Sequence, residues 1–143
     1  MPSYRTSATI KRPISEVFAY LTDVAAWPRW MNVEKTEPVD PGPPQVGSKA
    51  EGTLTEGGKS VPFSIEITRL EPDSFIGFRT LSGPMDWQGG WEVRAVDGET
   101  TDVTSVGEMR LQGLRRLLEP LMAGEIRKGE AAELVKLRGI LER

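Results

Sequence analysis

The chain has 143 residues, a net charge of −3, and neither cysteine nor histidine. The missing cysteine excludes disulfides, thiolate catalysis, zinc–thiolate sites and iron–sulfur clusters. The missing histidine removes the usual general base of neutral pH and the commonest metal ligand. Any chemistry must use carboxylates, Arg, Lys, Tyr, Ser or Thr, and the sequence indicates no metal site and no cofactor.

Length and charge also limit the partners. A chain of this length is typical of one domain, residues 1–143. With 18 basic against 21 acidic residues it lacks the excess of Lys and Arg that nucleic-acid binding needs. No run of about 18 apolar residues predicts a membrane span, and the N-terminus has no apolar segment of signal-peptide length. We therefore expect a cytoplasmic protein with no integral membrane segment and no nucleic-acid partner; its oligomeric state stays open.

The first elements are a strand and two short helices. Alternating side chains from Ser3 to Lys11 predict a half-buried strand, which Pro13 ends. A short amphipathic helix follows, with Ser15 as its expected N-cap and an apolar stripe formed by Ile14, Val17, Phe18 and Leu21. Asp23 to Trp30 predicts a second short helix or a turn.

From Val33 onward the hydrophobic period changes to two. Six strands are predicted: Val33–Val39, Ser48–Thr55, Ser60–Leu70, Ser74–Leu81, Asp86–Val96 and Thr101–Leu111. The segments between them are short and rich in Gly, Pro, Asp and Ser. Such short connections predict an antiparallel meander, because parallel crossovers need a dozen residues or more.

The last segment, Leu114 to Arg143, has the apolar spacing of a helix. Pro120, Gly124 and Gly129 are unfavourable inside a helix, so we expect a break or kink near Pro120 to Gly124. The charges of this helix are interpreted as a solvated face, with the i,i+3 pairs Glu125–Lys128 and Glu133–Lys136.

The element order favours an α+β architecture in which a seven-stranded, strongly curved antiparallel sheet wraps around a long C-terminal helix. Two short helices lie between the first and second strands. Because one helix cannot fill the inner face of such a sheet, we expect a cavity between sheet and helix.

The stretch IKRPISEVFAYLTDVAAWPRW resembles the opening of the START-like or SRPBCC superfamily, particularly its polyketide cyclase/dehydrase-like branch. The matching positions there are Pro13, Val17, Leu21, Trp27, Pro28 and Trp30. Thr101 and Val103 match the family's last-strand entry, and LVKLRGILE, Leu134 to Glu142, resembles its final helix. The resemblance covers essentially the whole chain.

This resemblance implies a helix-grip fold with a deep cavity for an apolar or amphipathic ligand. Members of the superfamily bind lipids, sterols or hormones, or cyclise and aromatise polyketides. The family has no universal catalytic motif to carry over, and members that use a cavity histidine have no counterpart here, so no catalytic residue is assigned.

Large apolar side chains on the expected inner faces are the candidate ligand-binding residues. Trp87 and Trp91 flank Gly89 on one face of a strand, and the glycine leaves interior space between them. Trp30 is open to two interpretations, a packing residue or a side chain at the cavity mouth. The full candidate set is Trp30, Phe63, Ile65, Phe78, Met85, Trp87, Trp91, Met109, Leu121 and Met122.

Polar candidates are few. Arg69 and Arg79 are interpreted as outer-face arginines, each paired with a Glu of a neighbouring strand, although an inward arginine would bind a carboxylate or polarise a carbonyl. Glu66 and Tyr20 qualify only if they enter the cavity.

Three functions follow from these observations. The first is binding of a small lipid-, polyketide- or isoprenoid-like molecule in the cavity. The second is an enzyme of the polyketide cyclase, aromatase or dehydratase type, which a polar cavity floor would favour. The third is a protein-interaction module whose cavity is filled by side chains and which exposes an apolar patch.

Overall fold

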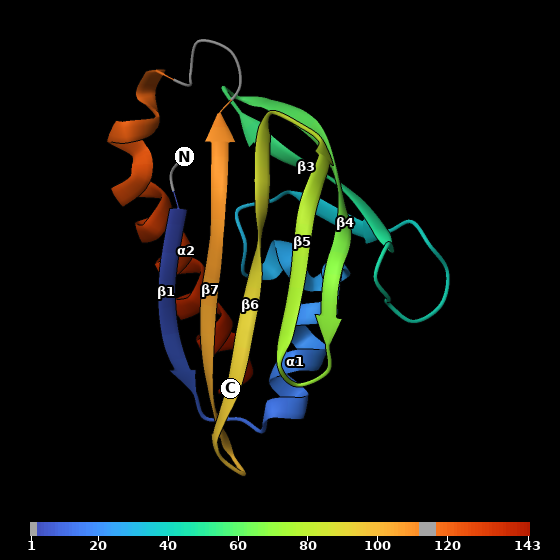
Figure 1. The fold of residues 1–143 in the computed structure, drawn as a ribbon, viewed down its shortest axis with the longest axis vertical. Helices are drawn as coiled ribbons and strands as arrows, with labels where there is room; N and C mark the ends of the chain where they lie inside the picture. Colours follow the sequence, from blue (N-terminus) through green and yellow to red (C-terminus); the bar gives the residue numbers. More distant parts are fainter. Residues whose placement is uncertain (1–2, 112–116) are drawn as a thin grey trace.

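The computed structural model describes residues 3–111 and 117–143. Seven strands form one antiparallel sheet in the order β1-β7-β6-β5-β4-β3-β2, and the sheet curves around its helices (Figure 1). The strands are β1 (Ser3–Ile10), β2 (Lys35–Pro38), β3 (Lys49–Glu56), β4 (Lys59–Glu71), β5 (Phe75–Ser82), β6 (Met85–Asp97) and β7 (Thr100–Leu111). The predicted fold class and the meander from the second strand to the seventh are thereby confirmed.

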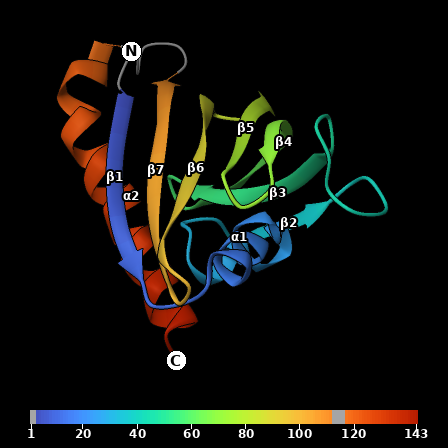
Figure 2. The same cartoon turned by 60° about the horizontal axis from the view of Figure 1, so that its bottom comes forward.

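The helices lie on one face of this sheet. They are α1 (Ile14–Thr22), the 3-10 helix η1 (Val24–Arg29) and the long α2 (Glu119–Leu141). Helix α2 runs along β1 and β7, whereas α1 contacts β6 and η1 contacts β2 (Figures 1 and 2). The two groups of helices therefore cover different parts of the same concave face.

Two details of the helices differ from the sequence prediction. Pro13, not Ser15, occupies the N-cap of α1, and no side chain caps this helix. Helix α2 is continuous from Glu119, because Pro120 lies in its first turn, where a missing N–H costs nothing. Gly124 and Gly129 stay helical inside it. The predicted break near Pro120 to Gly124 is therefore wrong; the start predicted at Leu114 lies outside the described residues.

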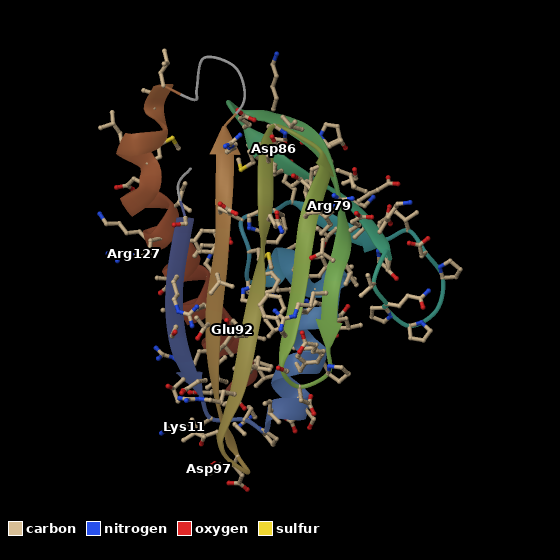
Figure 3. All side chains as sticks on the ribbon, in the orientation of Figure 1. Lys11, Arg79, Asp86, Glu92, Asp97 and Arg127 are labelled. Carbon is tan, nitrogen blue, oxygen red and sulfur yellow. The ribbon has the colours of Figure 1, made fainter. Side chains whose placement is uncertain are left out.

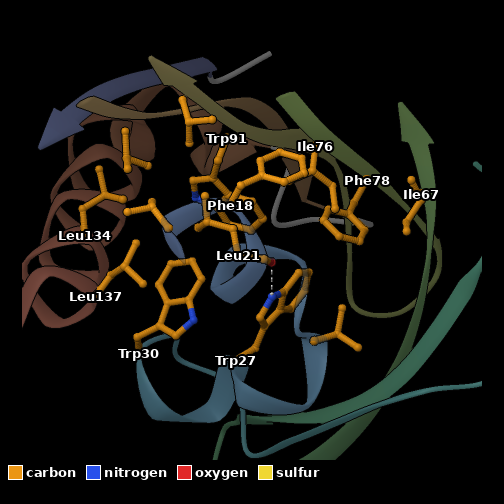
Figure 4. Close-up of a cluster of buried hydrophobic side chains, with 14 of the residues drawn as sticks. Phe18, Leu21, Trp27, Trp30, Ile67, Ile76, Phe78, Trp91, Leu134 and Leu137 are labelled. Carbon is orange, nitrogen blue, oxygen red and sulfur yellow. Dashed lines mark hydrogen bonds between the residues drawn. The ribbon is translucent and has the colours of Figure 1, made fainter. Parts of the chain in front are cut away.

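The hydrophobic core joins the short helices, the sheet and the second half of α2. Figure 4 shows one buried cluster that contains Trp91 of β6, with Phe18 and Leu21 of α1 and Leu134 and Leu137 of α2. Trp27 packs edge to face on Trp91 at a centroid distance of 5.5 Å, and its indole N–H donates to the Leu21 carbonyl oxygen at 3.1 Å. Aromatic packing thus fixes η1 against the sheet.

Among the described residues, no helix is both long and apolar enough to cross a membrane.

Candidate functional site

A cavity of about 490 Å³ lies between α2 and the concave face of the sheet. The segment that follows η1, with Met31, Asn32 and Val33, forms one side of it. The sheet contributes aromatic, aliphatic and methionine side chains, namely Phe63, Ile65, Met85, Trp87, Trp91 and Met109, with the hydroxyl-bearing Thr80. Helix α2 contributes the opposite wall, from Glu125 to Lys136. The cavity is therefore apolar on its sheet side and polar on its helix side.

The candidate residues from the sequence fall into two groups. Six of them line this cavity, and these are the six sheet residues Phe63, Ile65, Met85, Trp87, Trp91 and Met109. The other four lie elsewhere. Trp30 and Phe78 are each 1% exposed and pack in the core. Leu121 is 78% exposed, and Met122 lines a neighbouring depression of about 440 Å³ beside Met85.

Trp87 is held in the cavity wall by a hydrogen bond from its indole N–H to the Tyr4 hydroxyl oxygen, at 2.7 Å. Two glycines paired across β6 and β7 provide the space for this contact. A Cβ atom at Gly107 would come within 2.5 Å of the Tyr4 hydroxyl, and one at Gly89 within 2.9 Å of the Trp87 indole nitrogen. The interior space expected at Gly89 is thus partly taken up by the Trp87 indole ring.

The hydrogen bonds continue from Tyr4 to the helix. Tyr4 contacts Ser105, and the Ser105 hydroxyl donates to Oε2 of Glu130 at 3.2 Å. Burial, followed by the negative charge of Glu130, raises the pKa of Tyr4 above its ordinary value, so its phenol keeps its proton. These contacts connect the Trp87 indole, through the Tyr4 and Ser105 hydroxyls, to the Glu130 carboxylate.

Glu130 and Glu133 form a carboxylate pair on the cavity wall, one helical turn apart and hydrogen-bonded to each other. The backbone N–H of Asn32 donates to Oε2 of Glu133 at 2.9 Å. Desolvation and then the charge of Glu130 raise the pKa of Glu133 to about 8. Desolvation also raises the pKa of Glu130, and the hydrogen bond from the Ser105 hydroxyl acts in the opposite direction and lowers it. The pair therefore holds a proton at neutral pH, chiefly on Glu133.

This carboxylate pair was not predicted from the sequence. Glu133 was assigned to a solvated face as an ion-pair partner of Lys136, but it faces the cavity and makes no ion pair within the described ranges. The expected Glu125–Lys128 pair does form, at 3.6 Å. The helical spacing could have located this pair. Glu130 and Glu133 fall on the same face of α2 as the apolar residues Ile126, Leu134 and Leu137.

One polar group of the apolar wall lacks a partner. The indole N–H of Trp91 is buried and has no hydrogen-bond acceptor in residues 3–111 and 117–143. Trp91 also packs against Trp27, Trp30, Phe78 and Trp87, so it belongs both to the core and to the cavity wall. A buried donor without an acceptor is costly.

The arginines predicted on the outer face lie there. Arg79, labelled in Figure 3, pairs with Glu66 of the neighbouring strand as predicted, whereas Arg69 pairs with Glu71 of its own strand, β4. A larger depression of about 890 Å³ lies over outward-facing residues of β1, β6 and β7. Four of its charges pair with one another, Arg5 with Glu92 and Arg94 with Asp102.

No group of three or more acidic residues that could hold a metal ion occurs in the described part of the chain.

A curved sheet, a long C-terminal helix and a cavity between them define a helix-grip protein. The family model described as polyketide cyclase / dehydrase and lipid transport matches residues 1–142. The chain belongs to this family, and the resemblance found in the sequence is confirmed. No curated protein matches the chain in sequence.

Solved structures share the fold at low sequence identity. TTHA0849 from Thermus thermophilus has a TM-score of 0.80 at 20% identity, over 98% of this chain and 97% of that one. The Zhui aromatase/cyclase from Streptomyces sp. R1128 also has a TM-score of 0.80 at 20% identity, over 99% of this chain and 93% of that one. The di-domain aromatase/cyclase BexL has a TM-score of 0.76 at 20% identity; 97% of this chain matches 46% of that one.

Proposed function

We propose that this protein binds a small apolar or amphipathic molecule, lipid-, polyketide- or isoprenoid-like, in the cavity between α2 and the sheet. The observation that carries the proposal is the cavity of about 490 Å³, with aromatic and methionine side chains on one wall and a carboxylate pair on the other. Its volume falls within the range of roughly 300–1,000 Å³ typical of small-molecule sites. Apolar area with a few polar groups binds the body of a ligand and orients its polar end.

The cavity also bears on the third function considered from the sequence. An interaction module with a filled cavity leaves no space between helix and sheet, whereas here several side chains line open volume. Methionines such as Met85 and Met109 adapt to ligands of irregular shape. Small-molecule binding therefore accounts for the geometry better than protein interaction does.

A second candidate function, an enzyme of the cyclase, aromatase or dehydratase type, is favoured by the Glu130–Glu133 pair. A carboxylic acid beside a carboxylate in an apolar cavity supplies a proton donor and a proton acceptor. Arg69, Arg79 and Glu66 take no part, because they pair on the outer face. Zhui and BexL are described as aromatase/cyclases, which supports this candidate by likeness of fold alone.

Cavity binding is tested first by native mass spectrometry of gently purified protein, followed by denaturation and extraction. We expect a stoichiometric lipophilic adduct whose mass identifies the ligand class. The purified protein is then incubated with a compound of that class and extracted again. If extraction returns the compound that was added, the protein acts as a binder; if it returns a cyclised or dehydrated product, the enzyme function replaces it.

A matched pair of glycine substitutions tests the location. Gly129 lies on the cavity wall and Gly139 lies near the end of the same helix, away from the cavity; an added Cβ meets nothing within 4 Å at either position. Gly129→Leu places a side chain in the cavity, and both substitutions favour the helix by roughly 1 kcal/mol. We expect Gly129→Leu to reduce binding of the neutral fluorophore N-phenyl-1-naphthylamine at least tenfold, with Gly139→Leu unchanged. Equal binding by both variants would contradict a site at this wall.

A further inference from the structure

The Glu130–Glu133 pair lies in the cavity without a cation at ion-pair distance in the described structure, and the more distant charge of Lys136 only partly lowers the pKa of Glu133. Its hydrogen-bond donors from outside the pair are the neutral Ser105 hydroxyl and the neutral Asn32 backbone N–H. Neither carboxylate forms an ion pair with any described residue, and Lys136, which lines the same cavity, lies beyond ion-pair distance of both. Charges removed from water are normally paired or bound to a cation, so a carboxylate pair that has no ion-pair partner in a cavity indicates a position for a positive group.

The opposite wall supplies what the rest of a ligand needs. The indole rings of Trp27, Trp87 and Trp91 line the same cavity. Indole attracts organic cations and offers a large apolar surface. In addition, the buried N–H of Trp91 has no acceptor in the described part of the chain, and Trp91 is 2% exposed. This unpaired donor, independent of the carboxylates, favours a ligand with a polar atom on its apolar body, provided that the side chains covering the N–H move aside on binding.

We propose that the cavity binds an amphipathic amine, with its ammonium group between Glu130 and Glu133 and its apolar body against Trp87 and Trp91. The inference rests on the proposed binding function and names the charge of its ligand. A fatty-acid carboxylate would be repelled by the pair. A neutral alcohol would make a hydrogen bond there but would leave the carboxylate charge uncompensated.

Proton balance gives the inference a distinct signature. The pair holds one proton when the cavity is empty, and a bound R–NH₃⁺ favours ionisation of both carboxylates, so that proton passes to solvent. The other ionisable groups facing the pair are Glu125 and Lys136 on α2 and Tyr4 on β1. Because Glu133 titrates at about 8, amine affinity should rise by up to tenfold per pH unit from about pH 6 to about pH 8 and then level off.

The experiment compares three ligands that share one alkyl chain: decylamine, decanol and decanoate. Each displaces N-phenyl-1-naphthylamine from the full chain, below the concentration at which the ligand forms micelles. We expect decylamine to bind at least tenfold more tightly than decanol at about pH 8, and decanoate to bind most weakly. Calorimetry in buffers of different ionisation enthalpy should show proton release with decylamine and none with decanol.

Glu133→Gln and Glu130→Gln should each remove most of the preference for the amine while decanol still binds. Glu16→Gln, at an exposed position in the first turn of α1, removes the same charge far from the cavity and serves as the control. Equal affinity for decylamine and decanol overturns the inference and leaves cavity binding intact, as does a preference for decanoate. Failure of the fluorophore and of all three ligands to bind overturns the proposed function together with the inference.

Discussion

The two halves of α2 carry similar leucines in opposite environments. Leu134 and Leu137, near the end of the helix, are completely or almost completely buried, whereas Leu121, near its start, is 78% exposed. Glu130 and Glu133 lie between these halves, on the cavity wall. The comparison shows that the second half of α2 packs into the core, whereas its first half does not pack against the sheet. The cavity begins where this packing ends.

The largest expected effect comes from removing a core leucine of the packed half. Leu137→Ala should lower the free energy of unfolding by about 2–5 kcal/mol, because the deletion leaves a cavity in a rigid core. Urea denaturation measures this loss. Leu137→Met keeps most of the volume and should cost less than about 1.5 kcal/mol. If Leu137→Ala lowers the free energy of unfolding as little as Leu137→Met does, the end of α2 is not packed as described.

A smaller effect is expected at the boundary between the halves, from the proton on Glu133. Its pKa in the folded chain is about 8, against an ordinary value of 4.5, so the folded state binds the proton more tightly than the unfolded state. The resulting stabilisation is complete below about pH 4.5 and is lost as the pH rises to about 8.

Glu133→Gln keeps the neutral form at every pH and should flatten this profile. We expect the wild type to lose stability relative to the variant by an amount on the order of 2 kcal/mol between about pH 5 and about pH 8, because water in the cavity offsets part of the desolvation. Urea denaturation across this range, with Glu16→Gln as the control, measures the difference. Parallel profiles for wild type and Glu133→Gln would show that the carboxylate is solvated.

The sheet was predictable from the sequence because its signals are local. Alternating side chains and glycine-rich turns gave all seven strands within two residues at each end. Six cavity residues on the sheet followed from the same alternation.

What depends on tertiary position was not predictable in this way. Leu121 continues the apolar pattern of the helix, yet no wall covers it in the described structure. Glu133 was predicted on a solvated face because charged side chains are seldom buried, and Glu130 was not singled out. Pro120 was treated as a helix breaker although a first-turn proline does not break a helix.

The smallest effect is expected at the exposed leucine itself. Leu121→Ala should change the free energy of unfolding by no more than about 0.5 kcal/mol, because the leucine buries little area and alanine suits a helix. Urea denaturation beside Leu137→Ala gives a direct comparison of the two halves of α2. A loss approaching that of Leu137→Ala would show that the first half of the helix packs in solution. In that case the same variant should also change binding of the neutral fluorophore, because a helix that moves onto the sheet alters the volume of the cavity.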